Sequence, residues 1–156
     1  MKVDGKSSSQ IGYYSNHGWA IKKNVFGVAK TKEATPKVNQ DRLFITPKFC
    51  DASDAFLFGC YDGNGPKGEK VADMAGLEIC GLLEQRKDSV LGSDPRAAFI
   101  TAFREANAKI IKERFADKSG TTATVVFLRG SKVVVANVGD SKAVRATADA
   151  DGKWTP

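Results

Sequence analysis

Hydrophobic positions along the first third of the chain form short runs of the kind that strands show. Apolar, aromatic and β-branched residues cluster at 19–21, 25–29, 42–46 and 55–61, and each run predicts a strand. Pro36 indicates a break between the first two runs and the last two. The run at 55–61 is continuous rather than alternating, which predicts a strand buried on both faces.

Two amphipathic helices are predicted after these runs. The first follows the Gly/Pro-rich segment 62–66, and the second begins where Asp94 can cap it and Pro95 suits its first turn. In both segments apolar residues recur at the spacing of one helix face. These stripes consist of Val71, Met74, Ala75, Ile79, Leu82 and Leu83, and of Phe99, Ala102, Phe103, Ala106 and Ile110.

Strand patterns return after residue 120. The predicted strands cover 121–128, 132–138 and 142–147, with turns at 129–131, 139–141 and 149–152. Strands, then helices, then strands are segregated along the chain. This order favours an α+β fold with antiparallel sheet over a doubly wound parallel sheet.

Composition narrows the class of protein. With 156 residues, 42% hydrophobic and 27% charged, the chain is expected to be globular, and no apolar run is long enough to span a membrane. Residues 1–9 predict a flexible tail without a signal peptide, so the expected location is cytoplasmic or nuclear. The single histidine, His17, excludes an H-E-x-x-H zinc helix. The three cysteines form no C-x-x-C pair and predict free, buried thiols.

The net charge of +6 raises the question of an anionic partner. Lysine and arginine are scattered along the chain, and there is no aromatic signature for RNA and no helix-turn-helix spacing. We therefore interpret the excess charge as a solvated surface, with no nucleic-acid and no membrane partner.

Three aspartates stand where predicted strands meet turns: Asp41, Asp62 and Asp140. Hard cations such as Mg²⁺ or Mn²⁺ prefer carboxylate and carbonyl oxygens, and Gly63 has no Cβ to keep its carbonyl from a metal. Each aspartate taken alone is better explained as an ordinary turn residue that bonds its own backbone. Only their combination suggests a metal site.

Four motifs occur in a fixed order along the chain. They are V-N-Q-D at 38–41, F-G-C-Y-D-G-N-G-P at 58–66, S-G-T-T-A at 119–123 and V-A-N-V-G-D-S-K-A-V at 135–144. In this order they resemble the PP2C (PPM) family of metal-dependent protein serine/threonine phosphatases, in the style of its plant and protist members. The resemblance implies a sandwich of antiparallel sheets flanked by helices, two metal ions, and a phosphorylated protein as substrate.

The resemblance also implies roles for individual residues. Asp62 would bridge both metals, the Gly63 carbonyl would bind one of them, and Asp41 would bind directly or through water. Asp140 would belong to a third, weaker metal. Asp62 and Asn64 stand at the catalytic positions of the family, where Mg²⁺ or Mn²⁺ activates a water that attacks phosphorus.

The sequence departs from the family in three places. Asn64 replaces a histidine that acts as general acid, and Pro36 stands where many members have a phosphate-binding arginine. Lys37 beside it offers only a weak phosphate contact, a point charge without the arginine fork. The later family motifs, with two more metal ligands, would follow Pro156. Residues 10–156 are therefore expected to be the N-terminal portion of a PP2C-like domain, with an incomplete sandwich and no activity of its own.

Two hypotheses for function stay open at this point. The chain is either part of an active phosphatase or part of a pseudophosphatase, a binding or scaffold module in which Asn64 and Pro36 mark lost chemistry. Sheet edges left open by a partial domain also predict self-association.

Overall fold

The structure is a computed structural model that describes residues 11–16, 19–22, 33–92 and 94–155. The chain divides into two compact units, residues 1–38 and 39–156. In the first unit, β1 (Trp19–Lys22) pairs antiparallel with β2 (Glu33–Pro36). The strand predicted at 19–21 is therefore confirmed, and the one at 25–29 lies outside the described residues, as does His17.

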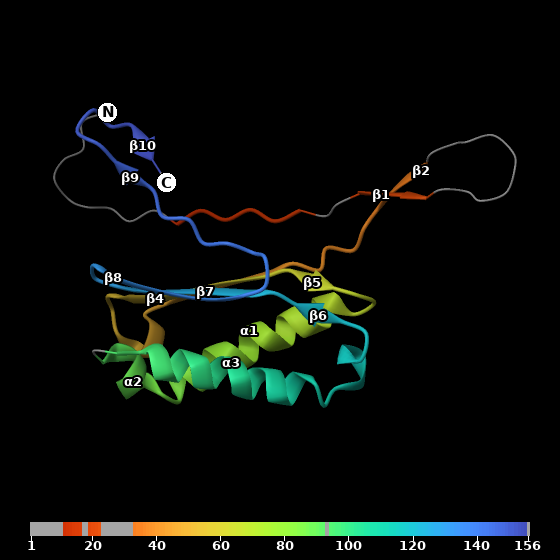
Figure 1. Ribbon diagram of the computed structural model, residues 1–156, viewed down its shortest axis with the longest axis horizontal. Helices are drawn as coiled ribbons and strands as arrows, with labels where there is room; N and C mark the ends of the chain where they lie inside the picture. The colour runs from red at the N-terminus through yellow and green to blue at the C-terminus, as the bar shows by residue number, and fades with distance from the viewer. Residues whose placement is uncertain (1–10, 17–18, 23–32, 93, 156) are drawn as a thin grey trace, which may run out of the picture. The chain divides into compact units, whose positions relative to one another are not determined.

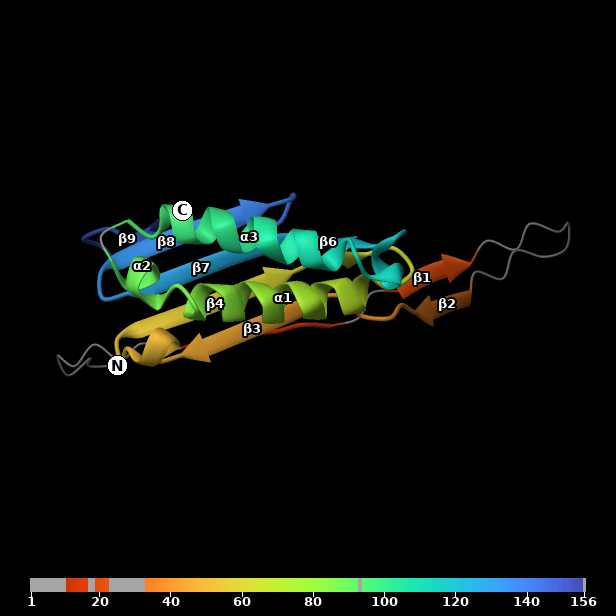
Figure 2. The same cartoon turned by 90° about the horizontal axis from the view of Figure 1, so that it is seen from below.

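The second unit is built on a four-stranded sheet in the order β3-β4-β7-β8 (Figure 2). Every neighbouring pair in this sheet is antiparallel, as the segregated pattern of strands and helices predicts. Its strands are β3 (Arg42–Pro47), β4 (Ala55–Tyr61), β7 (Ala123–Arg129) and β8 (Lys132–Val138). Two short two-stranded antiparallel sheets are also present: β5 (Gly63–Asn64) with β6 (Gly120–Thr121), and β9 (Thr147–Ala148) with β10 (Trp154–Thr155).

Two helices cover one face of this sheet (Figure 1). They are α1 (Gly68–Glu84) and α3 (Arg96–Ile110), with the short α2 (Lys87–Leu91) between them and the 3-10 turns Phe49–Asp51 and Arg114–Ala116 beside them. The predicted helical stripes face the sheet: Val71, Ala75, Ile79, Leu82, Leu83, Phe99, Ala102, Ala106 and Ile110 are buried, and Met74 and Phe103 are half-buried. The core therefore lies between the helices and the sheet.

Local signals explain where α3 begins and where the chain turns between β7 and β8. Asp94 Oδ1 accepts a hydrogen bond of 3.0 Å from the Arg96 N–H, which confirms the predicted cap. Between β7 and β8 the chain reverses at Gly130, whose φ of 54° lies in the left-handed region that favours glycine.

Three predictions were wrong. The strand β4 is not buried on both faces: Leu57 and Tyr61 on the helix side are buried, whereas Cys60 on the other face is exposed, because no helix covers that face among the described residues. Residues 142–147 form a strand only from Thr147, since the segment before it has no strand partner to pair with in the described part of the chain.

The prediction of buried thiols fails as well. The cysteines are free, as expected, but Cys60 is exposed, and Cys50 and Cys80 are only half-buried. Burial, the carboxylate of Glu84 and the Cys80 thiol together raise the pKa of Cys50 to about 11.

None of the described helices is both long enough and apolar enough to cross a membrane.

Candidate metal centre

The register of the sheet brings two of the predicted metal ligands side by side. Arg42, the first residue of β3, lies opposite Tyr61, the last residue of β4. Continuing this antiparallel register by one residue places Asp41 opposite Asp62. The Gly63 N–H then donates to the carbonyl of Gln40 (3.2 Å), so the pairing extends past the strand ends.

The two carboxyl groups interact directly. The pKa of Asp41 is raised, first by burial, then by the charge of Asp62 and by hydrogen bonding to the Asp62 side chain. The nearby Arg42 guanidinium acts in the opposite direction and is the weaker influence. Two neighbouring carboxylates that repel each other are stabilised by a shared proton or by a cation between them.

Arg42 fixes the backbone that carries Asp41. Its Nη1 donates to the carbonyls of Asp41 (2.8 Å) and Asn39 (3.2 Å), while its Nε donates to Asp73 Oδ1 on α1 (2.6 Å). The Asn39 side chain accepts the Asp41 N–H at 2.9 Å. The backbone at Asp41 is therefore tied to α1 through Arg42.

Gly63 lies where only glycine fits. A Cβ at this position would come within 2.5 Å of the Gln40 carbonyl oxygen and would also meet the carbonyl of Gly68 at the start of α1. The Gln40 side chain holds the following loop, since its Nε2 donates to the Gly65 carbonyl (2.8 Å) and to Glu69 Oε2 (3.0 Å). The turn after Asp62 is thus packed against both α1 and the segment before Asp41.

Thr122 joins Asp62 to the turn that contains Asp140. Its Oγ1 accepts the Asp62 N–H (3.0 Å), its own N–H donates to the Asp62 carbonyl (2.9 Å), and its hydroxyl shares a hydrogen bond of 2.7 Å with Ser141. Gly139, with a φ of 104°, packs on the Thr122 side chain so closely that a Cβ would lie 2.7 Å from Cγ2. The predicted turn at 139–141 is confirmed, and it lies at the same end of the sheet as Asp62.

Asp140 itself is exposed on that turn and is not part of the carboxylate pair. Asn64, also exposed, pairs with Gly120 where β5 and β6 run antiparallel. A Cβ on Gly120 would lie 3.4 Å from Asn64 Oδ1, so the amide lies over that glycine. Lys37 is exposed and belongs to the separate unit of residues 1–38.

The donor set suits a hard cation in kind, because two carboxylates and a neighbouring backbone carbonyl are oxygen ligands. The number of side-chain ligands is small, because across the part of the chain that the structure describes no three His, Cys, Asp or Glu side chains lie close enough together to hold a metal ion. Asp41, Asp62 and the Gly63 carbonyl would hold a metal here. Asp140 is not part of this pair, so its carboxylate would have to move closer to contribute a ligand.

Sequence reasoning missed the residues that hold this site together. Gln40, Arg42, Thr122 and Ser141 carry its hydrogen bonds, although all except Arg42 lie within the quoted motifs. The strand register could have indicated the contact between Thr122 and Asp62. Thr122 directly precedes β7, Asp62 directly follows β4, and these two strands pair antiparallel.

These features define a class, namely an α+β protein with an oxygen-donor site for a hard cation at one end of an antiparallel sheet. A family model described as "Protein phosphatase 2C" matches residues 27–155. The chain belongs to the protein phosphatase 2C family, which is metal-dependent.

Individual relatives agree with this assignment. A probable protein phosphatase 2C 35 of Arabidopsis thaliana is 34% identical over 118 residues, which are 75% of this chain and 33% of that protein. A probable protein phosphatase 2C 64 of Oryza sativa subsp. japonica is 32% identical over 147 residues, or 89% of this chain and 33% of the relative. The chain thus spans about a third of the length of these curated relatives.

A solved structure supports the fold. The serine-threonine phosphatase 2C from Toxoplasma gondii superposes with a TM-score of 0.61 at 18% identity, covering 76% of this chain and 44% of that one. The predicted α+β fold with antiparallel sheets and helices, PP2C-like and covering part of the family domain, is confirmed.

Proposed function

We propose that this chain supplies the Asp41–Asp62 half of the metal centre of a protein phosphatase that hydrolyses phosphoserine and phosphothreonine in proteins with Mg²⁺ or Mn²⁺. The observation that carries the proposal is the register that places Asp41 opposite Asp62 at the ends of β3 and β4, in a member of the phosphatase 2C family. Two bound cations would acidify a water and neutralise the phosphoryl oxygens during its attack.

The residues of this chain would act before and around that chemistry. Asp41 and Asp62 hold negative charge at one place, with Arg42 and Thr122 fixing their backbones from opposite sides. Gly63 lets the turn after Asp62 pack closely against the start of α1. Such preorganisation is what electrostatic catalysis requires.

A second candidate is a pseudophosphatase that binds phosphorylated protein without hydrolysing it. The observation that favours it is Asn64, whose amide cannot protonate a leaving alkoxide. General acid help is worth roughly 10²–10⁴-fold in rate. Lys37, exposed beside Pro36, provides a point charge but not a bidentate phosphate contact.

Phosphate release from a phosphothreonine peptide, measured with and without Mn²⁺ on a longer protein that contains this chain together with the rest of the family domain, separates the two candidates. The phosphatase proposal expects slow Mn²⁺-dependent release that Asp62→Asn abolishes and Asn64→His raises by about 10²-fold or more. A protein that binds Mn²⁺ but releases no phosphate, even as Asn64→His, would instead support the pseudophosphatase.

A further inference from the structure

The loop that follows Asp62 packs closely against two other segments of the chain. It runs from Gly63 to Lys67 and leads into α1 at Gly68. The Gly63 N–H donates to the Gln40 carbonyl (3.2 Å), and a Cβ on Gly68 would lie 2.6 Å from the carbonyl carbon of Gly63. Both glycines are buried. The first residue of the loop is therefore enclosed by the segment before Asp41 on one side and by the start of α1 on the other.

The Gln40 side chain contacts the middle of this loop and the first turn of α1. Its Nε2 donates to the Gly65 carbonyl (2.8 Å) and to Glu69 Oε2 (3.0 Å). Both partners are acceptors, and a primary amide carries two N–H groups on one nitrogen. Gln40 therefore satisfies both acceptors at once, which a carboxylate at this position could not do.

Glu69 is the acceptor for Gln40 on the helix. The hydrogen bond from Gln40, followed by one from its own backbone, holds the pKa of Glu69 below its usual value. The carboxylate is therefore charged at neutral pH, and hydrogen bonds to charged groups are stronger than those between neutral groups. An acid in the first turn also interacts favourably with the positive end of the helix dipole.

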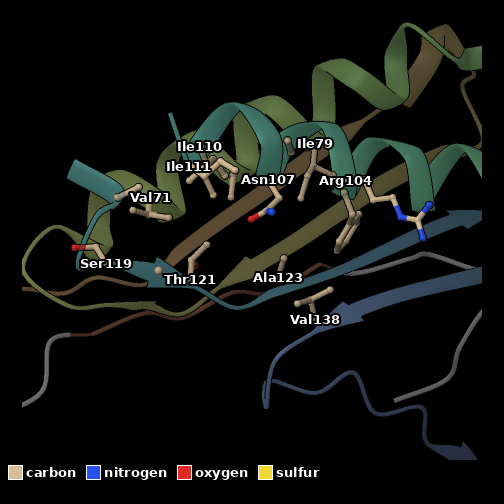
Figure 3. A pocket seen from close by; sticks show the side chains of 15 residues that line it. Val71, Ile79, Arg104, Asn107, Ile110, Ile111, Ser119, Thr121, Ala123 and Val138 are labelled. Carbon is tan, nitrogen blue, oxygen red and sulfur yellow. The ribbon is translucent and has the colours of Figure 1, made fainter. Parts of the chain in front are cut away.

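The far side of the loop is held by a different segment. Ser119 Oγ accepts the Lys67 N–H (2.9 Å), and a Cβ on Gly65 would meet the carbonyl oxygen of Lys118. Figure 3 shows Ser119 at one end of a pocket beside α1. These contacts fix the loop to the segment before β6, whereas the Gln40 side chain links it to the segment that carries Asp41.

We propose that Gln40, with Glu69 as its acceptor on α1, is a positioning residue that keeps the Asp62–Gly63 turn next to Asp41 and so raises the affinity of the candidate metal centre for a divalent cation. The inference rests on the proposed function, because Gln40 would act through Asp41 and Gly63 and not as a ligand itself. Residues that orient metal ligands typically contribute about 10–100-fold to metal affinity.

Amide hydrogen exchange in the metal-free chain tests the positioning itself. Gln40→Met keeps the length of the side chain but removes both N–H donors, so the Gly63 N–H is expected to exchange at least about tenfold faster. Amides in the middle of β4 and β7 should keep their rates, since their partners lie within the sheet. Unchanged exchange at Gly63, or an equal rise at Gly63 and in the sheet, would overturn the proposal.

Calorimetric titration with Mn²⁺ tests the consequence for the metal centre. Gln40→Met is expected to weaken binding about tenfold or more. Glu69→Leu removes one of the two acceptors and is expected to weaken binding less than Gln40→Met, whereas Glu69→Gln keeps an acceptor oxygen and should bind more tightly than Glu69→Leu. Both Glu69 variants remove the same charge, so their difference isolates the hydrogen bond from long-range attraction. Equal affinity in these two variants would contradict the role of Glu69.

The control for a general loss of stability is Asp94→Ala. This change also removes a carboxylate and a hydrogen bond, but at the start of α3 and outside the candidate metal centre. It is expected to bind Mn²⁺ like the unchanged chain. An equal loss of affinity in Asp94→Ala and Gln40→Met would show an effect of stability alone and would overturn the positioning role.

The two measurements separate this proposal from the metal centre on which it rests. If the unchanged chain binds no Mn²⁺ but Gln40→Met still speeds exchange at Gly63, the metal function fails while the hold of Gln40 on the turn is supported. If the chain binds Mn²⁺ and Gln40→Met alters neither exchange nor affinity, the metal centre stands and the positioning role of Gln40 is overturned.

Discussion

Gly76, in the middle of α1, determines how closely that helix can pack on the sheet. A Cβ at this position would lie within 2.6 Å of three ring atoms of Phe44 on β3. The Phe44 ring has little room to move, because it meets the buried Tyr61 edge to face with ring centroids 5.6 Å apart. Gly76→Ala should therefore destabilise the fold although alanine favours helices.

The magnitude follows from two opposing effects. Overpacking a core with one extra methyl group costs about 1–3 kcal/mol, and replacing glycine by alanine within a helix returns about 0.5–1 kcal/mol. The expected net loss for Gly76→Ala is about 1 kcal/mol. Gly81, in the same helix, has no atom within 4 Å of its Cβ position, so Gly81→Ala should gain up to about 1 kcal/mol.

Urea unfolding followed by circular dichroism measures both variants against the unchanged chain. The midpoint should fall for Gly76→Ala and rise for Gly81→Ala, with similar slopes. If Gly76→Ala were as stable as Gly81→Ala, the close contact between α1 and Phe44 would be wrong.

Three further predictions concern single side chains. Thr122→Val removes the acceptor of the Asp62 N–H and should lower the free energy of unfolding by about 1–2 kcal/mol. Thr122→Ser keeps the hydroxyl and should lower it less. An equal loss in both variants would show that the methyl group, not the hydrogen bond, is responsible. Asp94→Ala removes the cap on the Arg96 N–H and should cost about 1 kcal/mol in the same assay, with no change expected if the cap does not form. Burial raises the pKa of Cys50 from 9.0 to about 11, so its alkylation at pH 8 should be about 100-fold slower in the folded chain than in urea, as mass spectrometry would show; equal rates would contradict the burial.

Helices and strands were predictable where local sequence decides them. The apolar stripe from Val71 to Leu83 and the cap at Asp94 lie within single segments, and both are confirmed. Residues 142–147 have the same strand-forming composition, yet a strand also needs a partner, which composition does not reveal. The wrong expectation for β4 has a related origin, because its apolar run shows hydrophobicity on both faces but not what covers each face.

The resemblance named candidate ligands for the site, but the sequence did not reveal the hydrogen bonds that connect them. Resemblance to a family pointed to Asp41, Asp62, Gly63 and Asp140, and the structure brings the first two into contact. The hydrogen bond from the Asp62 N–H to Thr122 depends on how β4 and β7 align, and their sixty-residue separation hides that alignment from local patterns. For Asp140 the resemblance pointed to a ligand, but only its turn lies close to Thr122, through Ser141. Its carboxylate is not part of the Asp41–Asp62 pair.

Calorimetric titration with Mn²⁺ tests most directly whether the Asp41–Asp62 pair is a metal site. The intact chain should bind Mn²⁺ saturably, and Asp62→Asn should weaken the affinity by at least about tenfold. Removing a residue that only supports a metal ligand already lowers metal affinity about 10-fold or more, and removing the ligand itself should cost at least as much. Asp88→Asn, which removes an exposed carboxylate on α2, is the matched control and should bind like the unchanged chain. Absence of saturable binding, or equal affinity in Asp62→Asn, would contradict the assignment of this pair as a metal centre.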